Sequence, residues 1–171
     1  FLPKNKMSLF MPNPADSSFE VLNNYKNNNC SMDVFFALSH GVHRGILKTG
    51  KYDERADFVN KLVEITPNVK FDLYGINNVQ PVWADSFLKS ISNSKMGVNL
   101  SRGNPIKYYS SDRITQLIGN GLLTFIHKNT YYNNFFKDDE IIFYSNISNL
   151  SEQIQKYARD DKDRKRIAKK G

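Results

Sequence analysis

Alternating apolar and polar stretches predict a chain in which strands and helices follow one another. Short apolar runs of strand length occur at Asp33–Ser39, Val69–Tyr74, Lys95–Leu100, Leu122–Ile126 and Glu140–Tyr144. The first of these runs is apolar at successive positions. A strand that is buried on both faces is typical of a parallel sheet covered by helices.

Between the strands, apolar residues recur at helical spacing. They predict helices at Asp53–Ile65, Trp83–Ile91, Ser110–Gly119, Ser148–Arg159 and Asp160–Lys170. Ser148 is the N-cap candidate of its helix, and a further short helix is expected around Phe135 and Phe136. The alternation predicts an α/β fold: a Rossmann-like open parallel sheet of about five or six strands with helices on both faces.

The first 32 residues show a different pattern. Pro3, Pro12 and Pro14 interrupt any regular element, and a run rich in asparagine follows. We interpret residues 1–32 as an extended linker whose aromatic residues could still pack on the core. Residues 33–171 are interpreted as one domain.

Composition narrows the class of protein. The chain has 171 residues, a single cysteine and a formal net charge of +7. One cysteine excludes an intrachain disulfide and suits a reducing compartment, and no apolar run approaches the length of a membrane span. We therefore expect a cytoplasmic protein. The basic tail at 162–170 is interpreted as a solvated helix face, with peripheral contact with an anionic inner membrane as the alternative.

Tyr108–Ile126 carries the strongest candidate chemistry. Ser110 and Ser111 are residues that cap helices, Arg113 lies in the first turn, and Gly119 to Gly121 end the helix. A polar loop that enters a helix N-terminus favours an anion such as phosphate. An ordinary capped helix explains the same residues.

A second candidate is the loop after the first strand, His40–Gly45. It brings Gly41 and Arg44 to the strand's carboxyl end, where open α/β sheets hold ligands. Its two histidines are either surface residues or, with His127, metal ligands. Arg55 could reach a phosphate held there or pair with a neighbouring acid.

The later strand ends add further candidates. Ser101–Pro105 contributes Arg102 at the end of the third strand. Trp83, before the helix that precedes this strand, is interpreted as core packing, with lining of the cleft as the alternative.

The second half of the chain resembles a known family. The segments KMGVNLSRG (Lys95–Gly103), YYSSDRITQLIGNGLLTFI (Tyr108–Ile126) and the ending Ile147–Gly171 are similar to the carboxyl-terminal, nucleotide-sugar-binding domain of GT-B-fold glycosyltransferases. The similarity is closest to bacterial group 1 and lipopolysaccharide-biosynthesis-related proteins, and it extends weakly back to Asp33.

The resemblance implies that a donor diphosphate binds where the helix near Ser110 begins. On this basis the donor-binding residues would be Gly41, Arg44, Arg55, Arg102, Ser110, Ser111, Arg113 and Gln116. Many family members carry two Glu residues on this helix and its preceding loop. Here Tyr108 and Gln116 stand at those positions, which leaves the stereochemical outcome open. Gln116 could still hold ribose hydroxyls.

The implied function is donor binding, for a nucleotide-diphosphate sugar, within a hexosyltransferase-like enzyme of cell-surface polysaccharide or lipopolysaccharide synthesis. No metal or other cofactor is expected, and the catalytic acceptor domain would be an amino-terminal domain missing from this chain. The alternative is a non-catalytic α/β interaction module that has lost donor binding. Nucleic acid is not an expected partner, because the basic residues are dispersed and no recognised motif is present.

Overall fold

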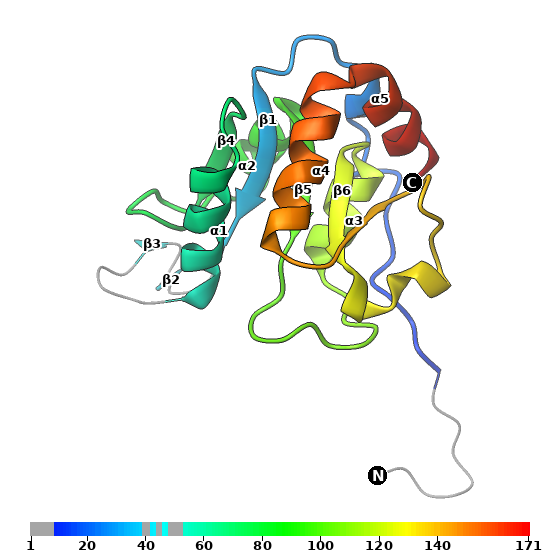
Figure 1. The fold of residues 1–171 in the computed structure, drawn as a ribbon, viewed down its shortest axis with the longest axis horizontal. Coiled ribbons are helices and arrows are strands. Elements are labelled where there is room, and N and C mark those ends of the chain that lie inside the picture. The colour runs from blue at the N-terminus through cyan, green and yellow to red at the C-terminus, as the bar shows by residue number, and fades with distance from the viewer. Residues whose placement is uncertain (1–8, 39–41, 44–45, 48–52) are drawn as a thin grey trace, which may run out of the picture.

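A five-stranded parallel sheet forms the centre of the domain. The computed structural model describes residues 9–38, 42–43, 46–47 and 53–171. The strand order is β4-β1-β5-β6-β7, and every neighbouring pair is parallel (Figure 1). The strands are β1 (Met32–Ala37), β4 (Phe71–Tyr74), β5 (Ser94–Asn99), β6 (Leu123–His127) and β7 (Ile142–Tyr144). The predicted α/β fold class is confirmed.

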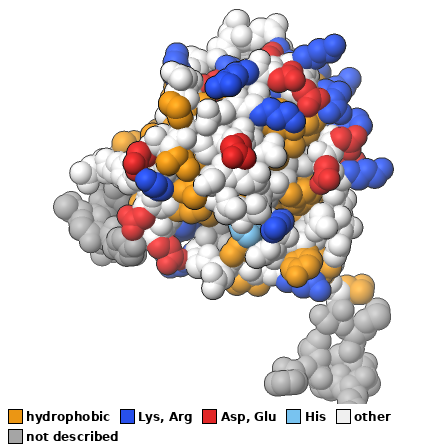
Figure 2. Space-filling view, in the orientation of Figure 1, with side chains coloured by type: hydrophobic (Ala, Val, Ile, Leu, Met, Phe, Trp, Pro, Cys, Tyr) orange, Lys and Arg blue, Asp and Glu red, His pale blue; other side chains and the backbone are white. Residues whose placement is uncertain are grey.

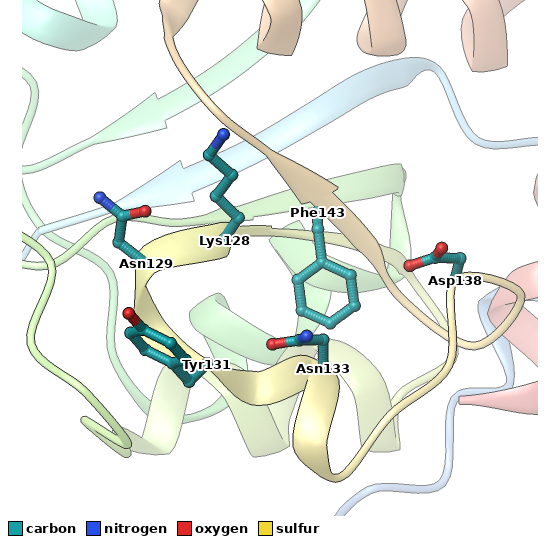
Figure 3. Close-up of a pocket in the computed structure, with 6 residues that line it drawn as sticks. All are labelled: Lys128, Asn129, Tyr131, Asn133, Asp138 and Phe143. Atoms are coloured by element: carbon teal, nitrogen blue, oxygen red, sulfur yellow. The ribbon is translucent and has the colours of Figure 1, made fainter.

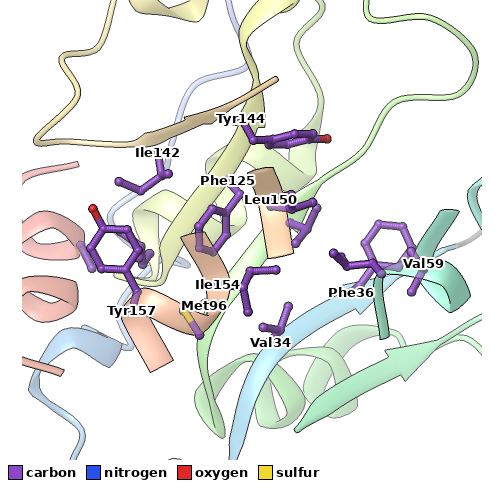
Figure 4. Close-up of a cluster of buried hydrophobic side chains, with 14 of the residues drawn as sticks. Val34, Phe36, Val59, Met96, Phe125, Ile142, Tyr144, Leu150, Ile154 and Tyr157 are labelled. Carbon is purple, nitrogen blue, oxygen red and sulfur yellow. The ribbon is translucent and has the colours of Figure 1, made fainter. Parts of the chain in front are cut away.

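The helices cover both faces of this sheet, as the sequence predicts. Side chains of alternate residues in β1 point to opposite faces: Val34 and Phe36 join one apolar cluster and Phe35 joins another. The first cluster packs α1 (Glu54–Ile65), α4 (Ile147–Arg159) and α5 (Asp161–Lys170) against the sheet (Figure 4). The second packs α2 (Ala84–Ser92) and α3 (Asp112–Gly119) on the other face.

Helix α3 ends at a turn that requires glycine. Asn120 follows the last helical residue, and Gly121 adopts a φ of +76°, which favours glycine. A Cβ at Gly121 would also lie 2.7 Å from the Tyr25 ring. The turn therefore leads directly into β6, and α3 begins at Asp112 with Ser111 as its N-cap residue.

Two local predictions need correction. Asn146, and not Ser148, caps α4: its side chain accepts a hydrogen bond from the backbone N–H of Asn149 at 2.9 Å. Both residue types cap helices, and the chain uses the earlier one. The short helix expected around Phe135 and Phe136 is instead a pair of 3₁₀ turns, η2 (Lys128–Thr130) and η3 (Tyr132–Asn134).

Part of the loop after β1 also differs from the predicted irregular loop. Val42–His43 (β2) and Ile46–Leu47 (β3) pair as two short antiparallel strands outside the main sheet.

Residues 9–31 run along the domain and include one 3₁₀ turn, η1 (Asn24–Lys26). Asn24 is buried, and its side-chain amide donates to the carbonyl oxygens of Ile91 at 2.6 Å and Ser94 at 2.9 Å. Its backbone N–H donates to the carbonyl of Asn120 at 2.8 Å. The segment thus connects the end of α2, the start of β5 and the turn after α3.

Candidate functional site

A cleft opens where the strand order of the sheet reverses. The chain passes from β1 to β4 on one side of β1 and then to β5 on the other side. In open α/β sheets, ligands bind at the carboxyl ends of strands beside such a switch point. A cavity of about 790 Å³ lies here, and its lining includes Ala37 and Leu38 after β1 and Leu100 after β5.

Arg113, from the first turn of α3, bridges these two strand ends. Its Nη1 donates to the carbonyl of Leu100 at 3.1 Å and its Nη2 to that of Ala37 at 3.0 Å. The guanidinium also lies 5.3 Å from the centre of the Phe36 ring. Burial and the positive charge of Arg55 lower the pKa of Arg113 to about 10, so the group stays charged at neutral pH.

Arg55 lines the same cleft and is fixed by Asp53, the N-cap residue of α1. Arg55 donates from Nε and Nη2 to the two carboxylate oxygens, both at 2.8 Å, and its backbone N–H also donates to Asp53. Arg102 Nη2 donates to the same carboxylate at 2.9 Å. Asp53 therefore joins two of the predicted arginines, although Arg102 is 64% exposed and is not among the residues that line the cleft.

The N-terminus of α3 supplies several of the polar residues that line the cleft. Ser111 and Gln116 line it, whereas Ser110 does not. The Ser111 hydroxyl makes no capping hydrogen bond and donates instead to Asn99 at 3.3 Å. The Ser110 hydroxyl accepts from the backbone N–H of Asn13 at 2.8 Å. Asp112, which also lines the cleft, places a negative charge in this first turn.

Tyr108 lies outside the cleft. Its ring packs with those of Phe10 and Phe135, with both centroid separations at 5.2 Å, and its hydroxyl accepts from the Asn134 amide at 2.5 Å. The backbone of Tyr108 has a φ of +58°, and its N–H donates to the carbonyl of Thr130. The side chain that replaces the first Glu of the family pattern therefore belongs to a surface aromatic cluster.

Aromatic side chains also line the cleft. Trp83, 49% exposed, lines it with Phe87 and Tyr109, so its interpretation as core packing is wrong. Phe19 and Glu20 reach the rim from the N-terminal segment. Sequence reasoning missed these two residues, because their contact depends on how residues 9–31 cross α3. The signal that could have indicated them is an aromatic residue, Phe19, beside an acid, Glu20, in a stretch interpreted as a linker.

Gly41 and Arg44 lie outside the described residues, and so does His40. His127, at the end of β6, accepts a hydrogen bond at Nδ1 from the backbone N–H of Asn129 at 3.1 Å. Burial lowers its pKa, so the imidazole is neutral at pH 7. Among the residues that the structure describes, no group of three or more His, Cys, Asp or Glu side chains could hold a metal ion.

The basic residues of α5 are largely paired with acids. Arg164 contacts Asp161 at 2.6 Å, and Arg166 contacts Asp163 at 2.5 Å. Figure 2 shows blue and red side chains interspersed on this part of the surface. The exposed side of α5 therefore agrees with a solvated helix face, whereas Arg164, Ile167 and Ala168 on its other side are buried in the domain. Within the described ranges, no helix is both long enough and apolar enough to span a bilayer.

Comparison with known proteins places this geometry in a family. A family model described as glycosyl transferase-like matches residues 54–171, which is most of the chain. Among solved structures, the crystal structure of TarM matches with a TM-score of 0.57 and 14% identity, over 85% of this chain. The matched region is 32% of the TarM chain, so this chain spans about a third of that structure. A comparison with the curated proteins finds no match. The chain therefore belongs to the glycosyl transferase-like family, as a GT-B-like glycosyltransferase domain with an open parallel sheet.

Proposed function

We propose that this domain binds the nucleotide-diphosphate-sugar donor of a glycosyltransferase in the cleft at the switch point. One observation carries the proposal. Two guanidinium groups, Arg113 and Arg55, line the same cavity as Ser111 at the N-terminus of α3. Guanidinium groups and helix N-termini are the groups that bind phosphate most readily.

The chemistry requires stabilisation of the leaving nucleoside diphosphate as its negative charge grows. A guanidinium has more N–H donors than the two carbonyl groups use, so Arg113 can bind a phosphate oxygen while it bridges β1 and β5. The N-terminus of α3 also has backbone N–H groups without helical partners, which are further donors for a phosphate. In the proposed transfer, these fixed charges and dipoles take the role that a metal ion has in other transferases.

Other lining residues can bind the remaining parts of the donor. The Gln116 amide can hold ribose hydroxyls, since it both donates and accepts hydrogen bonds. Trp83 and Phe87 provide flat apolar surface for the base. The donor sugar then faces a separate acceptor domain that supplies the general base. This chain alone is expected to bind nucleotide weakly and to transfer little sugar.

The proposed setting is the synthesis of cell-surface polysaccharide or lipopolysaccharide in a bacterium. Such synthesis draws on cytoplasmic nucleotide sugars at the inner membrane. The exposed cations of α5 suit a weak peripheral contact with anionic lipid. The resemblance to lipopolysaccharide-biosynthesis-related proteins supports this assignment.

A non-catalytic interaction module is the second candidate, and the charge balance of the cleft favours it. Asp53 neutralises Arg55, Arg113 already bonds two carbonyl groups, and Asp112 and Asp85 add negative charge to the lining. A cleft with this balance would bind a diphosphate weakly or not at all.

A thermal-shift titration with UDP, GDP, ADP, CMP and inorganic phosphate distinguishes the two candidates. We expect one nucleoside diphosphate to raise the Tm of the wild-type chain. Because Arg113→Ala also removes two structural hydrogen bonds, Arg113→Lys serves as a milder variant that keeps the charge but loses the planar fork. Arg159→Ala, an exposed arginine at the end of α4, is the matched control.

The expected result is a Tm increase that Arg159→Ala retains and both Arg113 variants lose. A wild-type chain that no nucleotide stabilises, either alone or joined to an acceptor domain, would refute donor binding and favour the interaction module.

A further inference from the structure

A second, smaller pocket lies between the ends of β6 and β7. Its volume is about 330 Å³, near the lower end of the ~300–1,000 Å³ range of small-molecule sites. Figure 3 shows the residues that line it: Lys128, Asn129, Tyr131, Asn133, Asp138 and Phe143. Apart from Phe143, which belongs to β7, they come from the connection between the two strands. None of them lines the switch-point cleft.

The polar side chains of this pocket have no hydrogen-bond partners elsewhere in the described part of the chain. That holds for the amides of Asn129 and Asn133, the hydroxyl of Tyr131, the Lys128 ammonium and the Asp138 carboxylate. The neighbouring Asp139, which does not line the pocket, contacts Lys170. The groups around the pocket can therefore all bond to a ligand.

The charge of the pocket selects the class of ligand. One ammonium and one carboxylate balance each other, and two amides and a phenol complete the polar set. Among the lining residues, an anion such as a nucleotide would meet the Asp138 carboxylate and one cation, and a further ammonium, Lys107 Nζ, lies 5.5 Å from the centre of the Tyr131 ring. A neutral molecule with many hydroxyl groups would find both donors and acceptors. Hydroxyl groups of a sugar each need one donor and one acceptor, which amide and carboxylate pairs supply.

Aromatic rings supply the other half of sugar recognition. Tyr131 is 50% exposed, and the Phe143 ring lies in the middle of the pocket (Figure 3). The C–H groups on one face of a pyranose form an apolar surface that packs on an aromatic ring. Tyr131 also holds a φ of +58° between η2 and η3, a conformation that costs free energy for a bulky residue. Such outliers cluster at functional sites.

We propose that this pocket is a binding site for a neutral saccharide, of the size of one to two pyranose rings, with Tyr131 as the stacking platform. The site is separate from the donor cleft. Its assignment as an acceptor-glycan subsite rests on the proposed function, whereas saccharide binding itself does not.

The test is a ¹H–¹⁵N NMR titration of the whole chain with chitotriose, cellotriose and mannotriose. We expect at least one trisaccharide to shift the amide signals of Asn129, Tyr131 and Asn133. Tyr131→Asn removes the ring but places a residue that tolerates positive φ, so the variant should fold at least as stably as the wild type. Its affinity for the trisaccharide should fall about tenfold, as expected for loss of a stacking ring.

Trp83→Ala is the matched control, because Trp83 is as exposed as Tyr131 but lies on the donor cleft. It should leave the trisaccharide shifts unchanged. The proposal is overturned if none of the three trisaccharides binds, if the shifts map to the cleft around Trp83, or if Tyr131→Asn binds like the wild type. UDP and GDP titrated in parallel test the donor cleft separately, so failure of one site is distinguishable from failure of the other.

Discussion

Asp53 offers a sharp test of how the fold prepares the cleft. Its side chain is 1% exposed and accepts three hydrogen bonds from Arg55, including a two-point contact from the guanidinium. The Arg55 side chain is 13% exposed. Replacement by Asn keeps an oxygen for the helix cap but removes the charge and puts N–H groups opposite the guanidinium.

The size of the effect follows from these contacts. Breaking a buried ion pair by removing one partner costs about 3–5 kcal/mol, and the partial exposure of Arg55 reduces this to about 2–3 kcal/mol. The Arg102 contact adds little, because that side chain is 64% exposed. Asp53→Ala also loses the cap, which costs about 1 kcal/mol more. For a domain of this size, each kcal/mol lowers the Tm by about 2–4 °C.

Urea unfolding followed by the fluorescence of Trp83, the single tryptophan, measures the free energy of unfolding. Glu64→Gln is the control, since it neutralises an exposed acid paired with Lys61 on the same helix and should change stability by less than about 1 kcal/mol. The conclusion that Asp53 holds Arg55 in place through a buried ion pair is refuted if Asp53→Asn and Glu64→Gln are equally stable.

The difference in stability between wild type and Asp53→Asn should also depend on pH, and it should decrease in acid. The pKa of Asp53 lies well below its usual range, chiefly because the Arg55 side chain donates hydrogen bonds to the carboxylate. Burial opposes this shift, and hydrogen bonds from the Arg55 backbone and from Arg102 add to it. A lowered folded-state pKa stabilises the protein above the unfolded-state pKa of about 3.9, and this stabilisation is lost as the pH falls toward the folded-state value. The difference between wild type and Asp53→Asn should therefore stay constant from pH 7 to about 5 and shrink below about 4.

Two further predictions concern packing. Gly97→Ala in β5 would place a Cβ 2.4 Å from Leu117 Cδ2, so we expect a loss of about 1–3 kcal/mol in urea unfolding. Because Leu117 is fully buried, Leu117→Ala is also destabilising, and the double variant should lose less than the sum of the two single losses; equal stability of Gly97→Ala and wild type would contradict the geometry. Asn24→Ala leaves the carbonyl groups of Ile91 and Ser94 without their side-chain donor and should lower the free energy of unfolding by about 1–3 kcal/mol, whereas an unchanged value would mean that water replaces the amide.

The strands and helices could be predicted because their signals are local. Each depends on the spacing of apolar residues and on short turn sequences such as Gly119–Asn120–Gly121. The bounds predicted for the five main strands and the five α-helices agree with the structure within two residues. The N-cap of α4 was wrong because Asn146 and Ser148 compete at a boundary where both fit. The family was predicted from the resemblance of whole segments, because the spacing of apolar residues does not distinguish one α/β family from another.

The cleft could be predicted only in part. That Arg55, Ser111, Arg113 and Gln116 share one cavity follows from the strand order, which no local pattern encodes. Contacts such as Arg102 with Asp53 join residues far apart in the chain, so the sequence could not show which arginines are already paired. Phe19 reaches the rim for the same kind of reason, through the path of residues 9–31.

The all-parallel sheet has a consequence for how the chain acquires its structure. Two parallel neighbours cannot be joined by a tight hairpin, so each of the four pairings must wait for an intervening crossover to form. The central strand β1 first meets β4, more than thirty residues later along the chain, and then β5, which is more distant still. Closing such long loops before the contacts form is slow. The chain is therefore expected to fold over milliseconds to seconds, with unpaired strand edges exposed in the meantime.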